Sequence, residues 1–201
     1  MKLTILGPPG SGKGSFAKRL GEDFRVPVIS VGDILREEVE NSSKIGKDIK
    51  SIMKKGDLIS DDIILKIVNK NLEEKDDVVF DGFPRTIKQI NVDIDRAVNL
   101  ICSDEICIER IMNRRICNKC KKIYNVVTEK PKKQGICDIC KGKLVSRSDK
   151  NVVKNRLRVF RRETLPIINY YKKKGNLVDI DAERNIDEVY RDIRKLFKPK
   201  K

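Results

Sequence analysis

A glycine-rich segment near the start of the chain carries the clearest chemical pattern. Residues 7–15 read GPPGSGKGS, follow a short apolar run at 3–6 and precede a helical pattern that begins at Ser15. Glycines let backbone N–H groups turn toward an anion, a helix N-terminus adds the positive end of its dipole, and Lys13 supplies a cation. The segment therefore predicts a phosphate-binding loop. The hydroxyl that usually follows the lysine of such a loop comes one residue later, at Ser15, because Gly14 intervenes.

Four cysteines form the second chemical pattern. They make two Cys-x2-Cys pairs separated by sixteen residues: Cys117, Cys120, Cys137 and Cys140. Four thiolates at this spacing predict a closed tetrahedral Zn²⁺ site that is structural rather than catalytic. Disulfides are the alternative, which a reducing compartment disfavours. A metal would stabilise residues 117–150, which are too few to build a core of their own, whereas Cys102 and Cys107 are expected to be small buried apolar residues.

Composition excludes several kinds of chemistry. The 201 residues include 45 Lys+Arg and 30 Asp+Glu, a formal charge of +15 that indicates an anionic partner or simply a solvated basic surface. Histidine is absent, which excludes Ser-His-Asp and Cys-His nucleophiles and every His-containing metal site. Aromatic residues make up 5%, without tryptophan, so base stacking on single-stranded nucleic acid is not expected. No apolar run has membrane-spanning length and no secretory signal is visible, so we expect a cytoplasmic protein with no membrane association.

The elements that must position these residues alternate between short apolar runs and charged helical stretches. The predicted strands cover 3–6, 26–29, 78–80, 100–102 and 177–180. This alternation predicts an α/β fold with a parallel five-stranded sheet and helices on both faces. Residues 30–59 and 117–150 interrupt it and are predicted to be insertions. A stripe in the last helix is predicted to face the core: Ile186, Val189, Tyr190, Ile193, Leu196 and Phe197.

The Gly-Lys-Gly-Ser ending of the phosphate loop resembles that of the adenylate kinases and their nucleoside monophosphate kinase relatives. Residues 30–36, SVGDILR, resemble the start of that family's AMP-binding insertion, and residues 81–85, DGFPR, with Gln89, resemble its second AMP-side motif. The arginines that enter and leave the family's lid are matched by Arg110, Arg114, Arg147 and Arg156. The resemblance covers nearly the whole chain.

The resemblance implies a P-loop core, a helical AMP-binding insertion and a small zinc-bearing lid. The implied core comprises 1–29, 60–113 and 151–201, the insertion 30–59 and the lid 114–150. The implied activity is reversible transfer of the γ-phosphoryl group of Mg-ATP to AMP, giving two ADP, by a monomer. The implied cofactors are Mg²⁺, held through water by Asp81, and structural Zn²⁺.

The resemblance also assigns individual residues. The implied catalytic residues are Lys13, Arg85, Arg114, Arg147, Asp149 and Arg156. The implied ATP site comprises Gly10, Ser11, Gly12, Lys13, Gly14, Ser15, Arg110, Arg114, Ile123, Tyr124 and the backbone around Arg184. The implied AMP site comprises Val31, Arg36, Asp57, Leu58, Ile59, Gly82, Phe83, Pro84, Arg85, Gln89, Arg147 and Arg156. Gln89 carries an amide donor and acceptor, the complement that an adenine edge requires.

Two departures from the family pattern keep alternatives open. Val31 stands where the family usually has a threonine that touches AMP, which leaves a UMP/CMP kinase as an alternative. The return from the lid, at 147–150, has one aspartate instead of two and is about two residues shorter, which could alter the rate. A further alternative belongs to another class of protein: a P-loop domain that carries a basic zinc ribbon and binds nucleic acid. The arginine motifs favour the kinase, since a nucleic-acid binder has no need of them.

Overall fold

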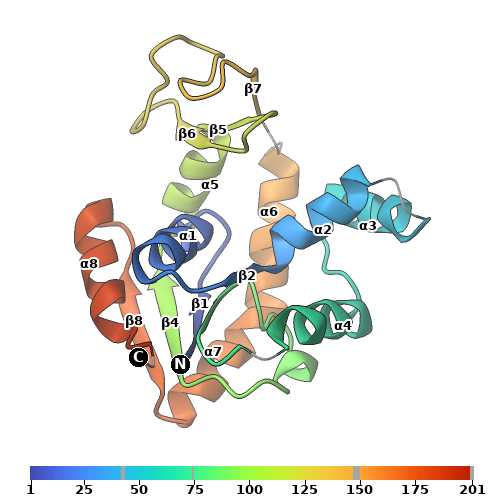
Figure 1. Cartoon of the computed structure of the whole chain (residues 1–201), viewed down its shortest axis with the longest axis vertical. Coiled ribbons are helices and arrows are strands. Elements are labelled where there is room, and N and C mark those ends of the chain that lie inside the picture. The colour runs from blue at the N-terminus through green and yellow to red at the C-terminus, as the bar shows by residue number, and fades with distance from the viewer. Residues whose placement is uncertain (42–43, 74, 147–149, 200–201) are drawn as a thin grey trace.

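Five parallel strands form the central sheet, in the order β2-β3-β1-β4-β8. The computed structural model describes residues 1–41, 44–73, 75–146 and 150–199 (Figure 1). The strands are β1 (Lys2–Leu6), β2 (Val28–Ser30), β3 (Val78–Asp81), β4 (Arg96–Ile101) and β8 (Leu177–Asp181). β1 lies between β3 and β4, so the strands that follow it are added on both of its sides. A ligand crevice is expected at the carboxyl ends of strands where the order reverses in this way. The predicted parallel five-stranded sheet is confirmed.

Alternating residues of the strands face two separate helical layers. Leu3 and Ile5 of β1 pack in a cluster with α1 (Lys13–Phe24) and α8 (Ile186–Leu196), whereas Leu6 packs in a cluster on the opposite face. That opposite layer contains α2 (Val31–Glu40), α3 (Lys44–Lys55), α4 (Asp61–Leu72) and α7 (Leu165–Lys173). A sheet covered on both faces explains why the strands read as continuous apolar runs.

Each of the five strands differs from its predicted range by at least one residue, most of all β2 and β4, and one core residue differs as well. β2 begins at Val28 rather than at residue 26, since Pro27 has no N–H and contributes only its carbonyl, which accepts from Val79 N at 3.1 Å. β4 begins at Arg96 rather than at residue 100, so polar Asn99 lies inside the strand, where its side chain donates to Asp179 Oδ1 at 2.7 Å. Ile186 is 57% exposed at the first turn of α8, so it does not belong to the core stripe.

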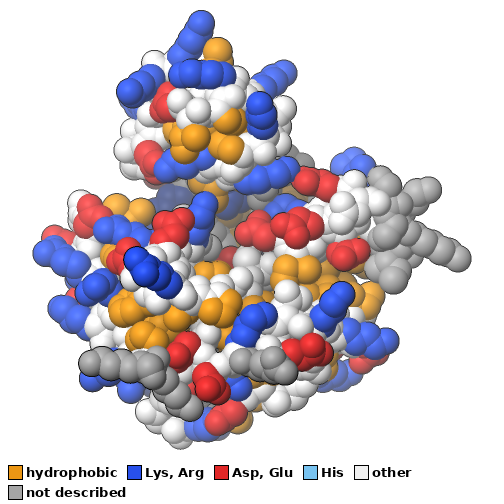
Figure 2. All heavy atoms as spheres, viewed as in Figure 1, with side chains coloured by type: hydrophobic (Ala, Val, Ile, Leu, Met, Phe, Trp, Pro, Cys, Tyr) orange, Lys and Arg blue, Asp and Glu red, His pale blue; other side chains and the backbone are white. Residues whose placement is uncertain are grey.

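A small second sheet projects from the end of two neighbouring helices. Strands β5 (Arg114–Cys117), β6 (Ile123–Asn125) and β7 (Leu144–Val145) pair antiparallel in the order β6-β5-β7. They stand above α5 (Asp104–Met112) and α6 (Lys150–Val159), which pack against each other in a small apolar cluster (Figure 1). We call residues 114–146 the lid. Figure 2 shows a hollow between the lid and the rest of the molecule.

α6 and α7 are joined by a π-helical turn at Phe160–Thr164. Pro166 lies in the first turn of α7 and has no backbone N–H to donate to the preceding π-helical turn. Thr164 Oγ1 donates to the backbone carbonyl of Arg85 at 3.2 Å, which ties this turn to the loop after β3. In the described ranges, we find no helix with the length and apolar character that crossing a membrane requires.

Candidate active site

The glycine-rich loop runs from the end of β1 into the first turn of α1. Gly10 and Gly12 have φ values of +97° and +95°, which favour glycine, and a Cβ at Gly10 would lie 2.5 Å from the carbonyl oxygen of Cys107. Ser11 Oγ is buried and makes no hydrogen bond to any part of the chain that the structure describes. An anion at this helix N-terminus would satisfy both the turned backbone and that hydroxyl.

Lys13 is folded back on this loop. Its Nζ donates to the carbonyls of Gly7 and Pro8, both at 2.7 Å. The pKa of Lys13 is lowered to about 8, chiefly by burial; Asp81 opposes the shift, and the positive charges of Arg85 and Arg114 add to it. The phosphate loop, the end of β3 and the start of the lid therefore act on one ammonium group.

Asp81 lies at the carboxyl end of β3, directly beside the start of α1. It accepts a hydrogen bond from Ser30 Oγ at 3.0 Å, at the end of the neighbouring strand β2. A Cβ at Gly14 would lie 3.0 Å from Asp81 Oδ2. Glycine after Lys13 therefore leaves room for this carboxylate, which is a physical reason for the displaced hydroxyl of the loop.

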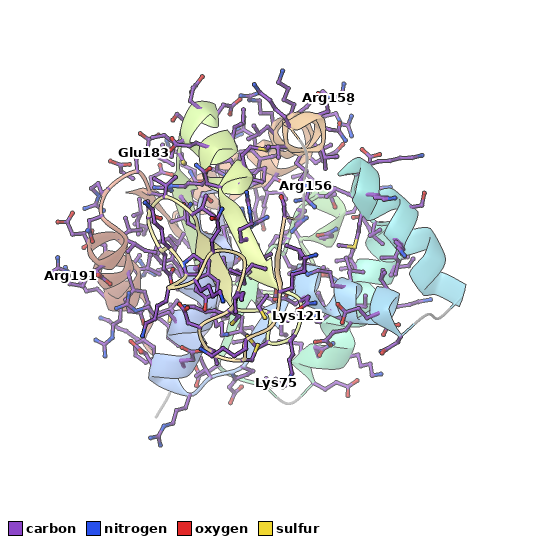
Figure 3. The ribbon with its side chains drawn as sticks, turned by 90° about the horizontal axis from the view of Figure 1, so that it is seen from above. Lys75, Lys121, Arg156, Arg158, Glu183 and Arg191 are labelled. Atoms are coloured by element: carbon purple, nitrogen blue, oxygen red, sulfur yellow. The ribbon has the colours of Figure 1, made fainter. Side chains whose placement is uncertain are left out.

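Three arginines from different elements form a cationic cluster. Arg36 comes from α2, Arg85 from the loop after β3 and Arg156 from α6. Burial lowers the pKa of Arg156, and the charges of Arg85 and Arg36 lower it further; burial and Arg36 likewise lower the pKa of Arg85. Figure 3 shows Arg156 directed toward the middle of the molecule, whereas Arg158 lies at the outer rim of α6. We call Arg36, Arg85 and Arg156 the arginine cluster.

The arginine cluster is only partly compensated by acidic groups. Arg36 forms an ion pair with Asp33 on its own helix, and Arg85 Nε donates to the carbonyl of Gly82 at 2.9 Å. Like charges held together favour binding of an anion that can accept hydrogen bonds from several guanidinium groups.

The segment that follows α3 is held by a residue that the sequence did not single out. Asn155 of α6 donates to the carbonyl of Lys55 at 2.8 Å and to Asp57 Oδ1 at 2.9 Å. Beside it, a Cβ at Gly56 would lie 3.0 Å from Arg156 Cγ. Asn155 and Lys55 are 100 residues apart, so no local pattern could reveal the contact.

Several other predicted site residues have buried side chains. Val31, Ile59 and Phe83 are 2%, 6% and 0% exposed and belong to the core, while Leu58 is half-buried and Asp57 exposed. Gln89 is 2% exposed, with its amide hydrogen-bonded to Asp61 and to the backbone N–H of Arg85. Gly82 and Pro84 are also buried, in the loop that carries Arg85.

The remaining predicted residues lie apart from the arginine cluster. Arg110 donates to Cys102 Sγ at 3.8 Å, and Arg184 is ion-paired with Asp192 at 2.9 Å. In the lid, Ile123 is 39% exposed, whereas Tyr124 is buried in the lid core. Arg147 and Asp149 lie outside the described residues.

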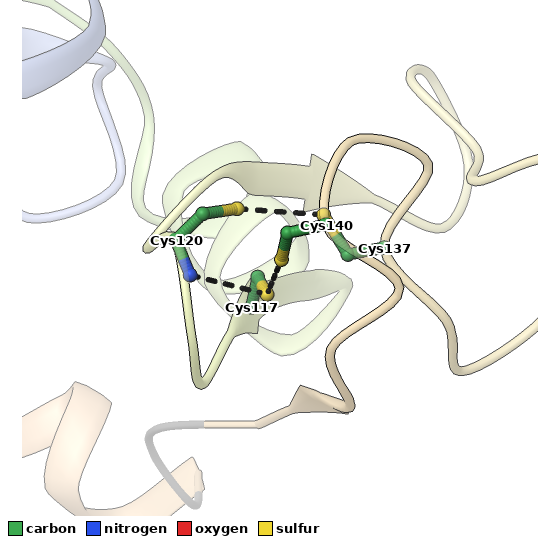
Figure 4. A group of neighbouring side chains, drawn as sticks. All are labelled: Cys117, Cys120, Cys137 and Cys140. Carbon is green, nitrogen blue, oxygen red and sulfur yellow. Dashed lines mark hydrogen bonds between the residues drawn. The ribbon is translucent and has the colours of Figure 1, made fainter.

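The four lid cysteines form a compact group (Figure 4). All four sulfur atoms lie within 4.8 Å of one another; Cys117 and Cys140 approach to 3.3 Å, and Cys120 and Cys137 to 3.5 Å. A disulfide requires about 2.05 Å, so these thiols are free. Four sulfurs about 2.3 Å from a tetrahedral Zn²⁺ would be about 3.8 Å apart. The group is therefore compatible with a metal ion.

The backbone around the four cysteines repeats one turn twice. Lys121 and Lys141 each follow the second cysteine of a pair, have φ values of +61° and +60°, and donate their N–H to the carbonyl of the first cysteine. A hydrogen bond from the hydroxyl of Tyr124 lowers the pKa of Cys137 to about 6. A Cβ at Gly142 would lie 2.8 Å from Cys117 Sγ. The two turns bring the four sulfur atoms together, and Gly142 leaves room for that of Cys117.

The phosphate-binding loop, the parallel sheet and the cations at its carboxyl ends define the class of P-loop nucleotide kinases. The family model described as "Adenylate kinase" matches residues 5–176. A protein named adenylate kinase from Petrotoga mobilis is 40% identical over 205 residues, which cover 96% of this chain and 95% of the relative. Adenylate kinases from Archaeoglobus fulgidus and Caldicellulosiruptor saccharolyticus are 38% and 42% identical; the matches cover 98% and 97% of this chain, and 98% of each relative. The chain belongs to the adenylate kinase family, the ATP:AMP phosphotransferases, which confirms the predicted family.

Proposed function

We propose that this chain transfers the γ-phosphoryl group of Mg-ATP reversibly to AMP, giving two ADP, without a covalent intermediate. The observation that supports this proposal is that the charges of Arg85 and Arg114 act on Lys13, and those of Arg36 and Arg85 act on Arg156, beside the loop that follows β3. Two nucleotides that exchange a phosphoryl group are polyanions, and they need such a set of cations between them.

On the donor side, the backbone N–H groups of residues 10–15 would hold the ATP phosphates, with Lys13 on the β and γ groups. Because Lys13 now donates to two loop carbonyls, phosphate oxygens would replace those acceptors. We assign Arg110, Arg114, Ile123 and Tyr124 of the lid and its entry, and the backbone at Arg184, to the rest of the ATP site, by family resemblance. Asp81 would hold the Mg²⁺ of Mg-ATP through water; that ion neutralises part of the phosphate charge.

On the acceptor side, the arginine cluster would hold the phosphate of AMP. Guanidinium groups stay charged and bind phosphate oxygens bidentately, so they also orient the attacking oxygen. Gln89 would read the adenine, and the loops after α3 and β3 would enclose the nucleotide: Val31, Asp57, Leu58, Ile59, Gly82, Phe83 and Pro84. Arg147 and Asp149 remain assigned to the catalytic set by resemblance.

In the reaction, a phosphate oxygen of AMP attacks the γ-phosphorus of ATP as the bond to the β-phosphate oxygen breaks. The phosphate oxygen of AMP already carries negative charge, so no general base is needed, in keeping with a chain that has no histidine. Lys13 and the arginines compensate the charge as it moves from the γ group to the β group.

We further propose three parts for the chain: a core of residues 1–29, 60–113 and 151–201, an AMP-binding insertion at 30–59 and a lid domain at 114–150. The four cysteines would hold a structural Zn²⁺, which leaves no open coordination position for catalysis. Four free thiols suit a reducing cytoplasm. All the cations named above come from one chain, which is compatible with a monomer.

The test is steady-state phosphotransfer from Mg-ATP to AMP, UMP, CMP and GMP in parallel at fixed salt. AMP-selective formation of ADP is expected, and Lys13→Ala should abolish it while leaving the fold intact. Lys18→Ala, on the exposed side of the same helix, is the matched control and should keep full activity. Preference for UMP or CMP would favour the alternative kinase. ATP binding without turnover would instead favour the nucleic-acid-binding alternative.

A further inference from the structure

A polar network surrounds the side chain of Gln89. Gln89 ends a short 3₁₀ turn, η1 (Ile87–Gln89), and Asp61 begins α4. Gln89 Nε2 donates to Asp61 Oδ1 at 2.7 Å, and Gln89 Oε1 accepts from the backbone N–H of Arg85 at 2.8 Å. Thr86 Oγ1 donates to the same Asp61 oxygen at 2.8 Å. Both ends of the amide are therefore engaged.

These partners allow only one orientation of the amide. The backbone N–H of Arg85 can only donate, so it requires the oxygen of the amide. A carboxylate can only accept, so Asp61 requires the nitrogen. Turning the amide of Gln89 by 180° would place N–H against N–H at one end and oxygen against oxygen at the other.

The fixed amide retains one lone pair on Oε1 and one hydrogen on Nε2. That pair of groups complements the edge of adenine, where an amino donor lies beside a ring acceptor. Hypoxanthine, the base of IMP, has the same size but presents a carbonyl acceptor beside an N–H donor, and it would need the amide turned around.

We propose that Asp61 is a positioning residue that sets the base specificity of the acceptor site by fixing the amide orientation of Gln89. This inference rests on the proposed function, in which Gln89 reads the base of AMP. Asp61 acts through Gln89, so its effect is on selection of the nucleotide. Thr86 supports it by donating a second hydrogen bond to the carboxylate.

The experiment compares kcat/KM for AMP with kcat/KM for IMP in Asp61→Ala and in the unchanged protein. Without Asp61 the amide of Gln89 is constrained only by the backbone N–H of Arg85, so the turned orientation costs less than before. AMP turnover should therefore fall, IMP turnover should rise, and the AMP/IMP ratio should drop about tenfold or more, as for loss of a hydrogen bond to a charged group. General damage to the site would lower both substrates and would not raise IMP. The KM for ATP should stay unchanged.

Two variants separate this role from a structural one. Asp61→Asn keeps an oxygen that accepts from Gln89 and Thr86, so it should retain a ratio close to that of the unchanged protein. Asp62→Ala removes the neighbouring exposed carboxylate from the same first turn of α4, and it should leave the ratio unchanged. Thr86→Val removes only the supporting donor and should lower the ratio about twofold to fivefold, which gives a reading if Asp61→Ala fails to fold.

An unchanged AMP/IMP ratio in folded Asp61→Ala, or in Thr86→Val where Asp61→Ala does not fold, would overturn the inference and leave the proposed function intact. On a Gln89→Ala background, the Asp61 substitution should have no further effect on the ratio, because the two residues act in one chain of contacts. If the unchanged protein does not phosphorylate AMP, the proposed function fails first and the inference fails with it.

Discussion

Replacing Arg156 by glutamine removes one charge from the arginine cluster and keeps a polar side chain in its place. In the unliganded protein, Arg156 is held beside Arg85 and Arg36, and burial together with those charges lowers its pKa. The substitution therefore relieves repulsion, and the free protein should keep or gain thermal stability. The bound state should behave oppositely, since the phosphate of AMP loses a bidentate partner.

The size of the loss follows from the contacts that one guanidinium can make. Two charge-assisted hydrogen bonds to a phosphate are worth about 1.5–3 kcal/mol each, or about 3–6 kcal/mol together. At 1.36 kcal/mol per decade, kcat/KM for AMP should fall by about 10²- to 10⁴-fold. The assay measures ADP formation against AMP concentration at saturating Mg-ATP, and thermal unfolding without nucleotide.

Arg158→Gln is the matched control for this prediction. Arg158 lies two residues further along the same helix, is exposed, and donates to Asn155 Oδ1 at 2.7 Å (Figure 3). Its loss should change kcat/KM for AMP less than about threefold, in the range of an exposed polar contact. Equal losses in the two variants, or an Arg156→Gln protein that keeps its AMP kinetics or unfolds at a lower temperature, would refute the reasoning.

Three further predictions concern the phosphate loop and the lid. Because the pKa of Lys13 is about 8 without ligand, kcat/KM for ATP should decline as the pH rises through about 8. The decline in kcat should lie at higher pH, since bound phosphate stabilises the ammonium. A flat kcat/KM profile to pH 10 would contradict this. Gly10→Ala should destabilise the protein by more than the roughly 1–2 kcal/mol that a left-handed alanine costs, because its Cβ would lie 2.5 Å from a carbonyl oxygen. Gly175→Ala is the control and should cost only that backbone strain, since Gly175 has a φ of +76° and open space around it. Equal melting temperatures of the two variants would contradict this prediction. The purified protein should contain one Zn²⁺ per chain. A strong chelator should unfold the lid before the core, as measured by hydrogen exchange of the backbone amides. Unchanged protection of the lid amides after metal removal would refute the four-cysteine site.

The sheet was predictable because buried parallel strands are apolar on both faces. The predicted boundaries were wrong where a polar group is compensated by a distant one, as at Asn99, whose partner Asp179 is 80 residues away. They were also wrong at β2, where Pro27 allows pairing only through its carbonyl. Such compensations depend on the neighbouring strand, so periodicity within one segment does not reveal them.

Two chemical motifs stand out in the sequence because their residue types and spacings are restricted. A Gly-rich turn before a helix and two Cys-x2-Cys pairs each have few physical explanations, and the structure indeed brings the four sulfurs together. Asp61 and Asn155 were missed, since an aspartate at a helix start and an asparagine within a helix have many ordinary explanations. Their contacts with Gln89 and Lys55 span 28 and 100 residues.

Helix α6 connects the lid with the segments that we assign to the acceptor nucleotide. It follows the lid in the chain, carries Arg156 to the arginine cluster, and through Asn155 holds the segment after α3. A movement of the lid that tilts α6 must therefore displace groups on the acceptor side as well. If the two sites are those proposed above, binding of one nucleotide should change the affinity for the other, and by thermodynamic reciprocity the two factors should be equal.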